Sequence, residues 1–564
     1  VNPNGTNLNL YMGHWTEGTM IIKRDGRYYM TYTGNHFQSK GYRVNYAVAE
    51  KGPFGPYHKP NNNPILINDM PISRNLGHSS FVYGPDLDSM YIAYHSYTGS
   101  LKNRVLNIDR LSFNGSRMYV SGPTWFDMPV PDMPDFALWP EDDPSAKLEK
   151  LETGEWKMLL STEGTNNRFT AEWNFSGDSG DVGVVFCRNE AGDYIRVLWL
   201  NNNNVVVQKC SKGEFKSLGS FELPQEFDRS VLHTVKVQYS PELLDVYFDG
   251  MHKLSYKDPG LDGGKIGYIY NGSQLEIGFV GFSHVYKGSG DHYAVKAVPG
   301  KFDAVHHLLE EGKGFGGKVS TGNLANDVKT LKLDGKGAWV SYSVSVEKEA
   351  SYCIAICVNN NTDKVKLEVL EDGKSLGVYD LKTEGAESVG FYTIPLACVS
   401  LKSGLHQLSL RLVEGNSIEI LDLELFEIDN KGLPLKLDLT KWDSAIYTCG
   451  DGSFDFGENG MFDSKATSDI KMTVGSRTWT DCIIDVDVIA GRSATGRSGV
   501  IFRTVNESYH PHQNHNAMQG YFAGIDGDGI FLKKVNYENT KDIVKIPYNF
   551  MEGETYHLRI EAIV

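Results

Sequence analysis

The chain has 564 residues, several times the length of an ordinary domain, so three or four separate cores are expected. Its 71 acidic and 55 basic residues give a net charge of -16, which disfavours nucleic acid and anionic membrane surfaces and favours a neutral ligand. No apolar stretch approaches the roughly 20 residues of a membrane span, and the many glycines and aromatic residues are typical of strands and tight turns. The composition predicts a β-rich protein without membrane insertion.

The beginning of the chain repeats itself with a period near 61 residues. In the first unit an expected strand over 19–23 meets the turn Asp25-Gly26, and in the second a strand over 79–83 meets the turn Pro85-Asp86. Four-stranded units repeated at about this length are typical of propeller blades. Two blades cannot close a ring and would leave strand edges unpaired, so we expect further blades upstream of Val1.

A second repeat joins two later regions. Residues 183–188 are similar to residues 499–503, and residues 233–237 are similar to residues 557–561. These matches indicate two copies of one sandwich, the second cut short by the end of the chain. The region between them alternates apolar and polar residues with period 2, which predicts a third sandwich.

The expected fold class is therefore all-β, a partial five-bladed propeller followed by three β-sandwich (jelly-roll) domains. The predicted domains are residues 1–131 for the last two blades, 135–290 for the first sandwich, 293–428 for the next, and 434–564 for the truncated second copy.

Three side chains stand out by their place in the repeat. Glu17 and His78 occupy equivalent positions just before the innermost strand of each blade, so both are expected to point to the central channel, where propellers bind ligands. A carboxyl group beside Trp15 can serve there as a general acid. Arg104 of the second unit aligns with Arg43 of the first unit. The alternatives are a solvated carboxylate at Glu17, a hydrogen-bonded channel histidine at His78 and an inter-blade salt bridge at Arg104.

The residues of the first region resemble glycoside hydrolase family 43. The resemblance is carried by Trp15-Thr16-Glu17-Gly18, Asp25-Gly26-Arg27-Tyr28-Tyr29, Gly77-His78-Ser79-Ser80 and Gly84-Pro85-Asp86, in this order over about 110 residues. The resemblance implies a five-bladed propeller and an inverting mechanism that uses three acidic residues. Glu17 matches the general acid, whereas the general base and the Asp that tunes the acid lie in the family's early blades, outside this sequence.

The same resemblance suggests what surrounds the acid. Trp15, His78 and Arg104 are the expected substrate-binding residues, with Arg104 matching a last-blade arginine that reaches the sugar or the acid. His78 matches the channel histidine, which in the family often lies near a bound calcium or sodium ion, so His78 is also the candidate metal ligand. No other cofactor is expected.

The later regions resemble accessory domains. Residues 135–290 and 434–564 are similar to concanavalin or laminin-G-like jelly rolls, for which packing against the propeller and sugar binding both remain open. Residues 293–428 resemble family 6 carbohydrate-binding modules through Trp339-x-x-Tyr342 and Asp372-Gly373.

Together these resemblances predict an exo-acting, inverting glycoside hydrolase of α-L-arabinofuranosidase or β-xylosidase type. Its expected partner is a plant cell-wall oligosaccharide or polysaccharide, and its expected location is outside the bacterial cytoplasm, secreted or periplasmic. Without the general base, this stretch of chain is expected to be inactive alone. The alternatives are a non-catalytic glycan-binding protein, which would lack acids in the upstream blades, and a surface adhesion protein that binds ligands at the sandwich rims.

Overall fold

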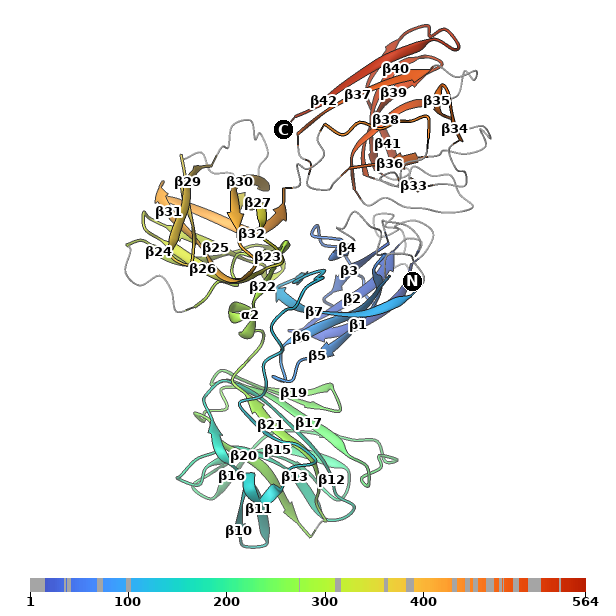
Figure 1. Cartoon of the computed structure of the whole chain (residues 1–564). Coiled ribbons are helices and arrows are strands. Elements are labelled where there is room, and N and C mark those ends of the chain that lie inside the picture. The colour runs from blue at the N-terminus through green and yellow to red at the C-terminus, as the bar shows by residue number, and fades with distance from the viewer. Residues whose placement is uncertain are drawn as a thin grey trace. The chain divides into compact units, whose positions relative to one another are not determined.

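The regular secondary structure of the computed structural model is almost entirely β-strand (Figure 1), which confirms the predicted all-β class. It describes residues 16–34, 37, 42–67, 75–97, 103–272, 274–309, 316–359, 364–381, 390–428, 434–441, 447–449, 455–462, 471–475, 479, 481–489, 497–505, 519–536 and 539–563. No helix in these ranges is long and apolar enough to cross a bilayer. The chain divides into two compact units, one of Val1–Phe81, Ile92–Met128 and Val295–Val564 and the other of Val82–Tyr91 and Pro129–Ala294.

The first two sheets have the strand order of propeller blades. They contain β1 (Thr16–Arg24), β2 (Arg27–Gly34), β3 (Arg43–Ala49) and β4 (Leu66–Ile67), then β5 (Gly77–Tyr83), β6 (Met90–Tyr97), β7 (Arg104–Asn114) and β8 (Arg117–Val120). Within each sheet, strands that follow one another in sequence are neighbours. Asp25 and Gly26, which join β1 to β2, have φ of 48° and 78°, as a two-residue hairpin turn requires.

The 61-residue repeat places its matched residues at equivalent points of the two sheets. Glu17 is the second residue of β1 and His78 is the second residue of β5. Arg43 and Arg104 begin β3 and β7. In both sheets the matched side chains therefore come from the starts of two strands. The first strand supplies Glu17 or His78, and the third strand supplies Arg43 or Arg104.

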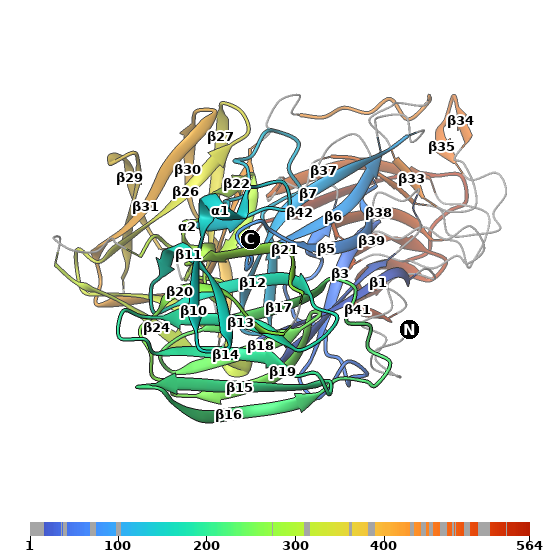
Figure 2. The same cartoon turned by 90° about the horizontal axis from the view of Figure 1, so that it is seen from below.

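Two larger sheets form most of the second unit. The seven-stranded sheet has the order β10 (Leu148–Thr153), β11 (Trp156–Thr165), β20 (Gly264–Asn271), β13 (Asp181–Arg188), β14 (Tyr194–Trp199), β15 (Asn204–Ser211) and β16 (Glu214–Glu222). The six-stranded sheet has the order β19 (Met251–Lys257), β18 (Leu243–Phe248), β17 (His233–Tyr239), β12 (Phe169–Ser176), β21 (Glu276–Ser283) and β9 (Phe136–Leu138). The same unit contains two one-turn helices, α1 (Pro144–Lys147) and α2 (Gly290–Tyr293). Strands β13 to β16 lie side by side in Figure 2.

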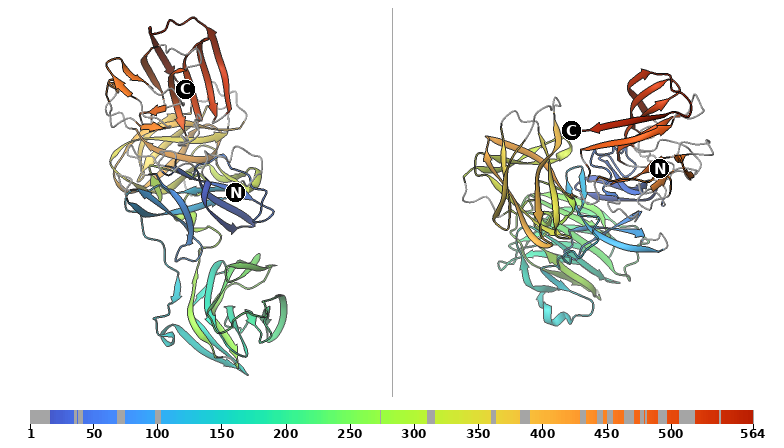
Figure 3. Two further views of the ribbon diagram at one scale, coloured as in Figure 1. Left: turned by 90° about the vertical axis from the view of Figure 1, so that its right-hand side faces the viewer. Right: turned by 45° about the horizontal axis from the view of Figure 1, so that its top comes forward.

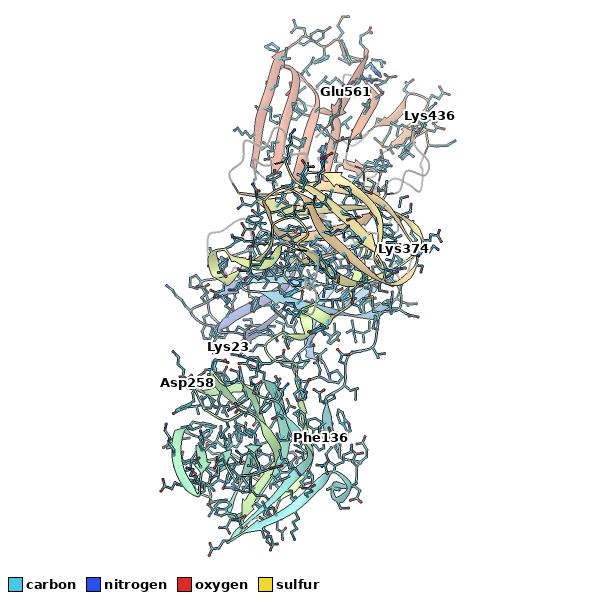
Figure 4. All side chains as sticks on the ribbon, turned by 90° about the vertical axis from the view of Figure 1, so that its left-hand side faces the viewer. Lys23, Phe136, Asp258, Lys374, Lys436 and Glu561 are labelled. Atoms are coloured by element: carbon cyan, nitrogen blue, oxygen red, sulfur yellow. The ribbon has the colours of Figure 1, made fainter. Side chains whose placement is uncertain are left out.

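The core of this unit lies between its two sheets, which appear as two layers in the left view of Figure 3. Trp173 of β12 is fully buried, and its ring centroid lies 6.0 Å from that of Phe186 on β13. Phe136, labelled in Figure 4, stacks on Phe282 of β21 at 5.6 Å. The turn between β5 and β6 also belongs here, because buried Asp88 accepts hydrogen bonds from Gln238 Nε2 at 2.9 Å and from the Gly288 amide at 2.6 Å.

Residues 296–427 form another pair of sheets around one core. The first contains β22 (Lys296–Val298), β26 (Trp339–Val346), β31 (Gly404–Glu414), β28 (Lys366–Glu371) and β29 (Lys374–Asp380). The second contains β24 (Lys318–Asn323), β25 (Lys329–Asp334), β32 (Ser417–Glu427), β27 (Ala350–Asn359) and β30 (Phe391–Leu401), with β23 (Gly300–Asp303) paired to β32 and a 3-10 turn, η2, at Ala325–Asp327. Tyr342, Ile354 and Leu410 are among its fully buried residues.

A buried polar cluster joins this domain to the second blade. Arg117 of β8 donates to Asp422 Oδ2 at 2.7 Å, and Asn114 Nδ2 donates to Asp303 Oδ1 at 3.0 Å. The Tyr119 hydroxyl also donates to Asp422, at 3.0 Å. Asp303 and Asp422 face each other across β23 and β32, and both are buried. The last blade and residues 296–427 therefore share one hydrogen-bonded cluster.

The last region contains β33 (Tyr447–Cys449), β34 (Asp455–Gly457), β35 (Gly460–Phe462), β36 (Lys471–Thr473), β37 (Cys482–Ile489), β38 (Ser498–Val505), β39 (Gln519–Asp526), β40 (Gly529–Asn536), β41 (Asn539–Pro547) and β42 (Thr555–Ala562). Its β38 repeats a feature of β13. Cys187 and Arg503, the residues that the sequence repeat aligns, both have positive φ, 55° and 49°. Both strands have a bulge at this point. The repeat therefore preserves a backbone irregularity as well as residue types.

Candidate active site

Glu17 lies at a bulge of β1, between Glu17 and Met20. Gly18 takes φ of 60° there, and a Cβ added to it would lie 3.1 Å from Cγ of His78. Glycine at this position therefore allows the start of β1 to approach the start of β5. The Glu17 side chain is exposed, and its Oε1 accepts a 2.9 Å hydrogen bond from the hydroxyl of buried Tyr42.

His78 is held in an unusual backbone conformation. It is a non-glycine residue with φ of 55°, and its amide donates a 2.7 Å hydrogen bond to Thr33 Oγ1. The preceding Gly77 packs so closely that a Cβ there would overlap the Tyr42 ring and lie 2.7 Å from the Thr33 methyl group. This left-handed conformation at a candidate site residue is the kind of local strain that functional sites retain. The His78 side chain is exposed to solvent.

Arg104 begins β7 and is exposed. Its Nε donates to the Tyr97 hydroxyl at 2.9 Å, and its guanidinium lies 5.5 Å from the centroid of the Tyr97 ring. The hydrogen bond to Tyr97 raises the pKa of Arg104. Within the described ranges no carboxylate forms an ion pair with Arg104, so the inter-blade salt bridge considered from the sequence is not observed there.

His95 of β6 lies among these residues. Its ring contacts Tyr42 at 5.8 Å and meets Tyr97 edge-on at 5.6 Å. Burial, with repulsion from the charges of Arg104 and His78, lowers the pKa of His95 to about 4, while Glu17 acts in the opposite direction. The imidazole is therefore neutral at ordinary pH, and the predicted residues Glu17, His78 and Arg104 all act on it electrostatically.

The sequence did not point to Tyr42, His95 or Tyr97, which connect the predicted residues. Aromatic residues and a histidine on blade strands have no distinguishing spacing, and only the tertiary contacts show their role. Trp15, expected to contact substrate, lies outside the described residues. The expected ion is not supported by a ligand set, because the described residues contain no group of three or more His, Cys, Asp or Glu side chains that could hold a metal.

Two other carboxylates of the family-like region, Asp109 and Asp86, have structural roles. Asp109 is buried and accepts hydrogen bonds from the Tyr94 hydroxyl at 2.6 Å and from Thr124 Oγ1 at 2.5 Å. Asp86 is buried as well, and its Oδ1 accepts from the Ser89 amide at 2.9 Å. Both carboxylates are therefore engaged in hydrogen bonds within their own surroundings.

Residues 4–117 match Glycosyl hydrolases family 43, and residues 314–430 match Carbohydrate binding module (family 6). A β-D-galactofuranosidase of Aspergillus niger is 33% identical over 103 residues, which are 18% of this chain and 29% of that enzyme. The chain thus spans less than a third of this fungal relative.

Two solved structures are among those similar to parts of this chain. An endo-1,4-β-xylanase from Bacteroides thetaiotaomicron is 28% identical, covering 21% of this chain and 41% of that one with a TM-score of 0.19. The carbohydrate-binding module CBM66 from Bacillus subtilis is 14% identical, covering 24% and 91% with a TM-score of 0.22. The chain thus has one segment, residues 4–117, that matches glycosyl hydrolases family 43 and another, residues 314–430, that matches family 6 carbohydrate-binding modules.

Proposed function

We propose that the complete protein is an exo-acting, inverting glycoside hydrolase that removes arabinofuranosyl or xylosyl side chains from plant polysaccharides outside the bacterial cytoplasm. The observation that carries this proposal is the exposed Glu17 carboxyl, oriented by Tyr42 within the segment that matches family 43. The plant-polysaccharide assignment rests on the resemblance and on the glycosidase and xylanase names of similar proteins.

In the proposed reaction Glu17 protonates the glycosidic oxygen as the bond from that oxygen to the anomeric carbon breaks. A water molecule adds to the opposite face of the sugar while a second carboxylate takes its proton, so one water is consumed and the anomeric configuration inverts. Inverting enzymes hold the two carboxyl groups roughly 6.5–9.5 Å apart to leave room for that water. Asp86 and Asp109 are both buried and hydrogen-bonded, so we assign the base to an upstream blade.

Arg104 and His78 bind the substrate in this proposal. Arg104 lies where its exposed guanidinium can donate to sugar hydroxyls, while its bond to Tyr97 holds it in place. His78 supplies an exposed imidazole within contact of Gly18, next to the acid.

The test compares residues 1–564 with a protein extended upstream through all the blades, each assayed on aryl α-L-arabinofuranosides and aryl β-D-xylosides. We expect only the extended protein to hydrolyse these substrates. Nuclear magnetic resonance of the first-formed product should show the inverted anomeric configuration. Activity of residues 1–564 that is abolished by Glu17→Gln would contradict the assignment of the base upstream. Retention of configuration would contradict the proposed mechanism.

A further inference from the structure

Arg196 is a buried cation on the seven-stranded sheet of the second unit. It lies on β14, where Ile195, Val197 and Trp199 face the core between the sheets. Because side chains alternate along a strand, Arg196 points to the opposite face, together with Tyr194 and Leu198. Only 7% of Arg196 is exposed.

The guanidinium of Arg196 is enclosed by aromatic rings and one amide. Its Cζ lies 4.1 Å from the ring centroid of Phe215 on β16 and 4.9 Å from that of Trp156 on β11. Its Nε and Nη2 both donate to Gln208 Oε1, at 3.0 and 2.7 Å. Its Nη1 is buried without a hydrogen-bond partner, and no carboxylate of the described ranges forms an ion pair with it.

A buried charge without a counter-ion is costly unless something pairs with it. Burial accordingly lowers the pKa of Arg196. Arg229 in the same unit shows how a partly buried guanidinium is usually stabilised, with a hydrogen-bond acceptor for each nitrogen. Its guanidinium lies 4.6 Å from the Trp199 ring, and Nε, Nη1 and Nη2 donate to three backbone carbonyls at 3.0, 2.7 and 2.9 Å. Arg229 therefore has a partner for each nitrogen and Arg196 does not.

We propose that Arg196, Gln208, Trp156 and Phe215 form a binding site for an acidic sugar, in which a uronic acid carboxylate accepts hydrogen bonds from the Arg196 guanidinium. The planar guanidinium matches the two oxygens of a carboxylate, and the apolar surroundings of Val185 and Leu160 strengthen such a pair. An aromatic ring beside the cation suits a pyranose, whose C–H face packs on aromatic rings.

Phe215 is the exposed wall of the proposed site. This residue lies on β16, the edge strand of the sheet, and 49% of it is exposed. Its ring covers the guanidinium and meets Tyr194 edge-on at 6.4 Å. In this proposal the half-exposed ring moves aside to let the carboxylate reach Nη1. Trp156 on β11 is partly exposed and stays as the second wall.

The inference is tested by isothermal titration calorimetry of the whole 564-residue chain with trigalacturonate, and with xylotriose as the neutral probe. We expect trigalacturonate to bind, to bind more weakly at high salt, and to lose at least tenfold in affinity in Arg196→Met. Xylotriose binding, if measurable at other sites of the chain, should not differ between the two proteins. Undetectable trigalacturonate binding at millimolar concentration, or equal binding by Arg196→Met, would overturn the proposal.

Two matched variants separate a ligand site from a structural arginine. Replacing the unpaired Arg196 by Met should leave the melting temperature unchanged or raise it, whereas Arg229→Met should lower it, because three backbone carbonyls lose their donors. Phe215→Ala should weaken trigalacturonate binding several-fold with little effect on melting. A large fall in melting temperature in Arg196→Met, together with unchanged binding in Phe215→Ala, would show that Arg196 is structural.

Discussion

The Tyr42 hydroxyl donates a 2.9 Å hydrogen bond to Oε1 of Glu17, and the Tyr42 ring is 1% exposed. Burial, with the bond to the carboxylate, raises the pKa of Tyr42 well above its ordinary value. The phenol therefore remains a donor at any working pH. A buried donor of fixed position holds the otherwise exposed carboxyl of Glu17 in one orientation.

Removing this donor tests that positioning role. In the complete protein Tyr42→Phe should lower kcat about tenfold, about 1.4 kcal/mol of transition-state stabilisation, with a smaller change in KM. The loss should be larger on substrates with poor leaving groups, since these depend on the acid. Tyr57→Phe is the control, because the Tyr57 hydroxyl in the same blade donates to the carbonyl of Pro53, at 2.8 Å, away from Glu17. Equal kcat for the wild type and Tyr42→Phe would show that the bond has no catalytic role.

Gly77→Ala should disturb the site without touching a polar group. The added Cβ would overlap the Tyr42 ring, so the ring must shift and its hydroxyl must leave Glu17. We expect a loss of activity at least as large as in Tyr42→Phe, and a lower melting temperature. Gly52→Ala is the control, because a Cβ there meets no atom within 4 Å. Full activity in Gly77→Ala would contradict the packing described here.

The sequence was informative where structure is local or repeated. The turn Asp25-Gly26 and the matched positions of Glu17 and His78 follow from residue types and spacing, and the family resemblance was confirmed. The domain boundaries remain predictions. The partners Tyr42 and His95 could not be foreseen, because their contacts join strands distant in sequence, and a buried tyrosine or histidine is ordinary in a β-sheet. Arg196 was equally hidden, since the burial of its guanidinium with Nη1 unbonded is a property of the folded surroundings.

The carboxyl group of Asp303 should make stability depend on pH. Burial raises the pKa of Asp303 to about 8, with Asp422 adding repulsion, against the attraction of Arg117 and Lys301 and the hydrogen bond from Asn114. The folded state thus binds a proton that the unfolded chain releases near its ordinary pKa of about 4. The contribution of this carboxyl group to the free energy of unfolding is fully present below about pH 4, declines between about pH 4 and pH 8, and is lost above about pH 8.

Asp303→Asn replaces the titratable carboxyl group by an amide of similar shape that binds no additional proton in this pH range. Denaturant unfolding of the 564-residue chain at pH 6 and pH 9 should show the wild type losing stability relative to Asp303→Asn as the pH rises. The slope is at most about 1.4 kcal/mol per pH unit, because one proton is involved. A difference between the two proteins that does not change with pH would mean that Asp303 is ionised throughout this range.

Arg117 should be a strong determinant of stability. Arg117→Ala would leave the buried carboxyl groups of Asp303 and Asp422 without their shared guanidinium, at a cost of about 3–5 kcal/mol in the free energy of unfolding. Lys348→Ala, which breaks a partly exposed ion pair with Glu427 in the domain of residues 296–427, should cost less than about 1 kcal/mol. Similar small losses in both variants, measured by denaturant unfolding, would show that the buried cluster adds little.

The role of Glu17 as the general acid is tested most directly by the dependence of Glu17→Gln on the leaving group. In the complete protein the substitution should reduce kcat about 10²–10⁴-fold on oligosaccharides, whose leaving alcohol must be protonated. It should have little effect on 2,4-dinitrophenyl glycosides, whose leaving group needs no proton. That divergence between the two substrate classes is the predicted result. An equal loss on both classes, whether small or large, would contradict the assignment of Glu17 as the acid.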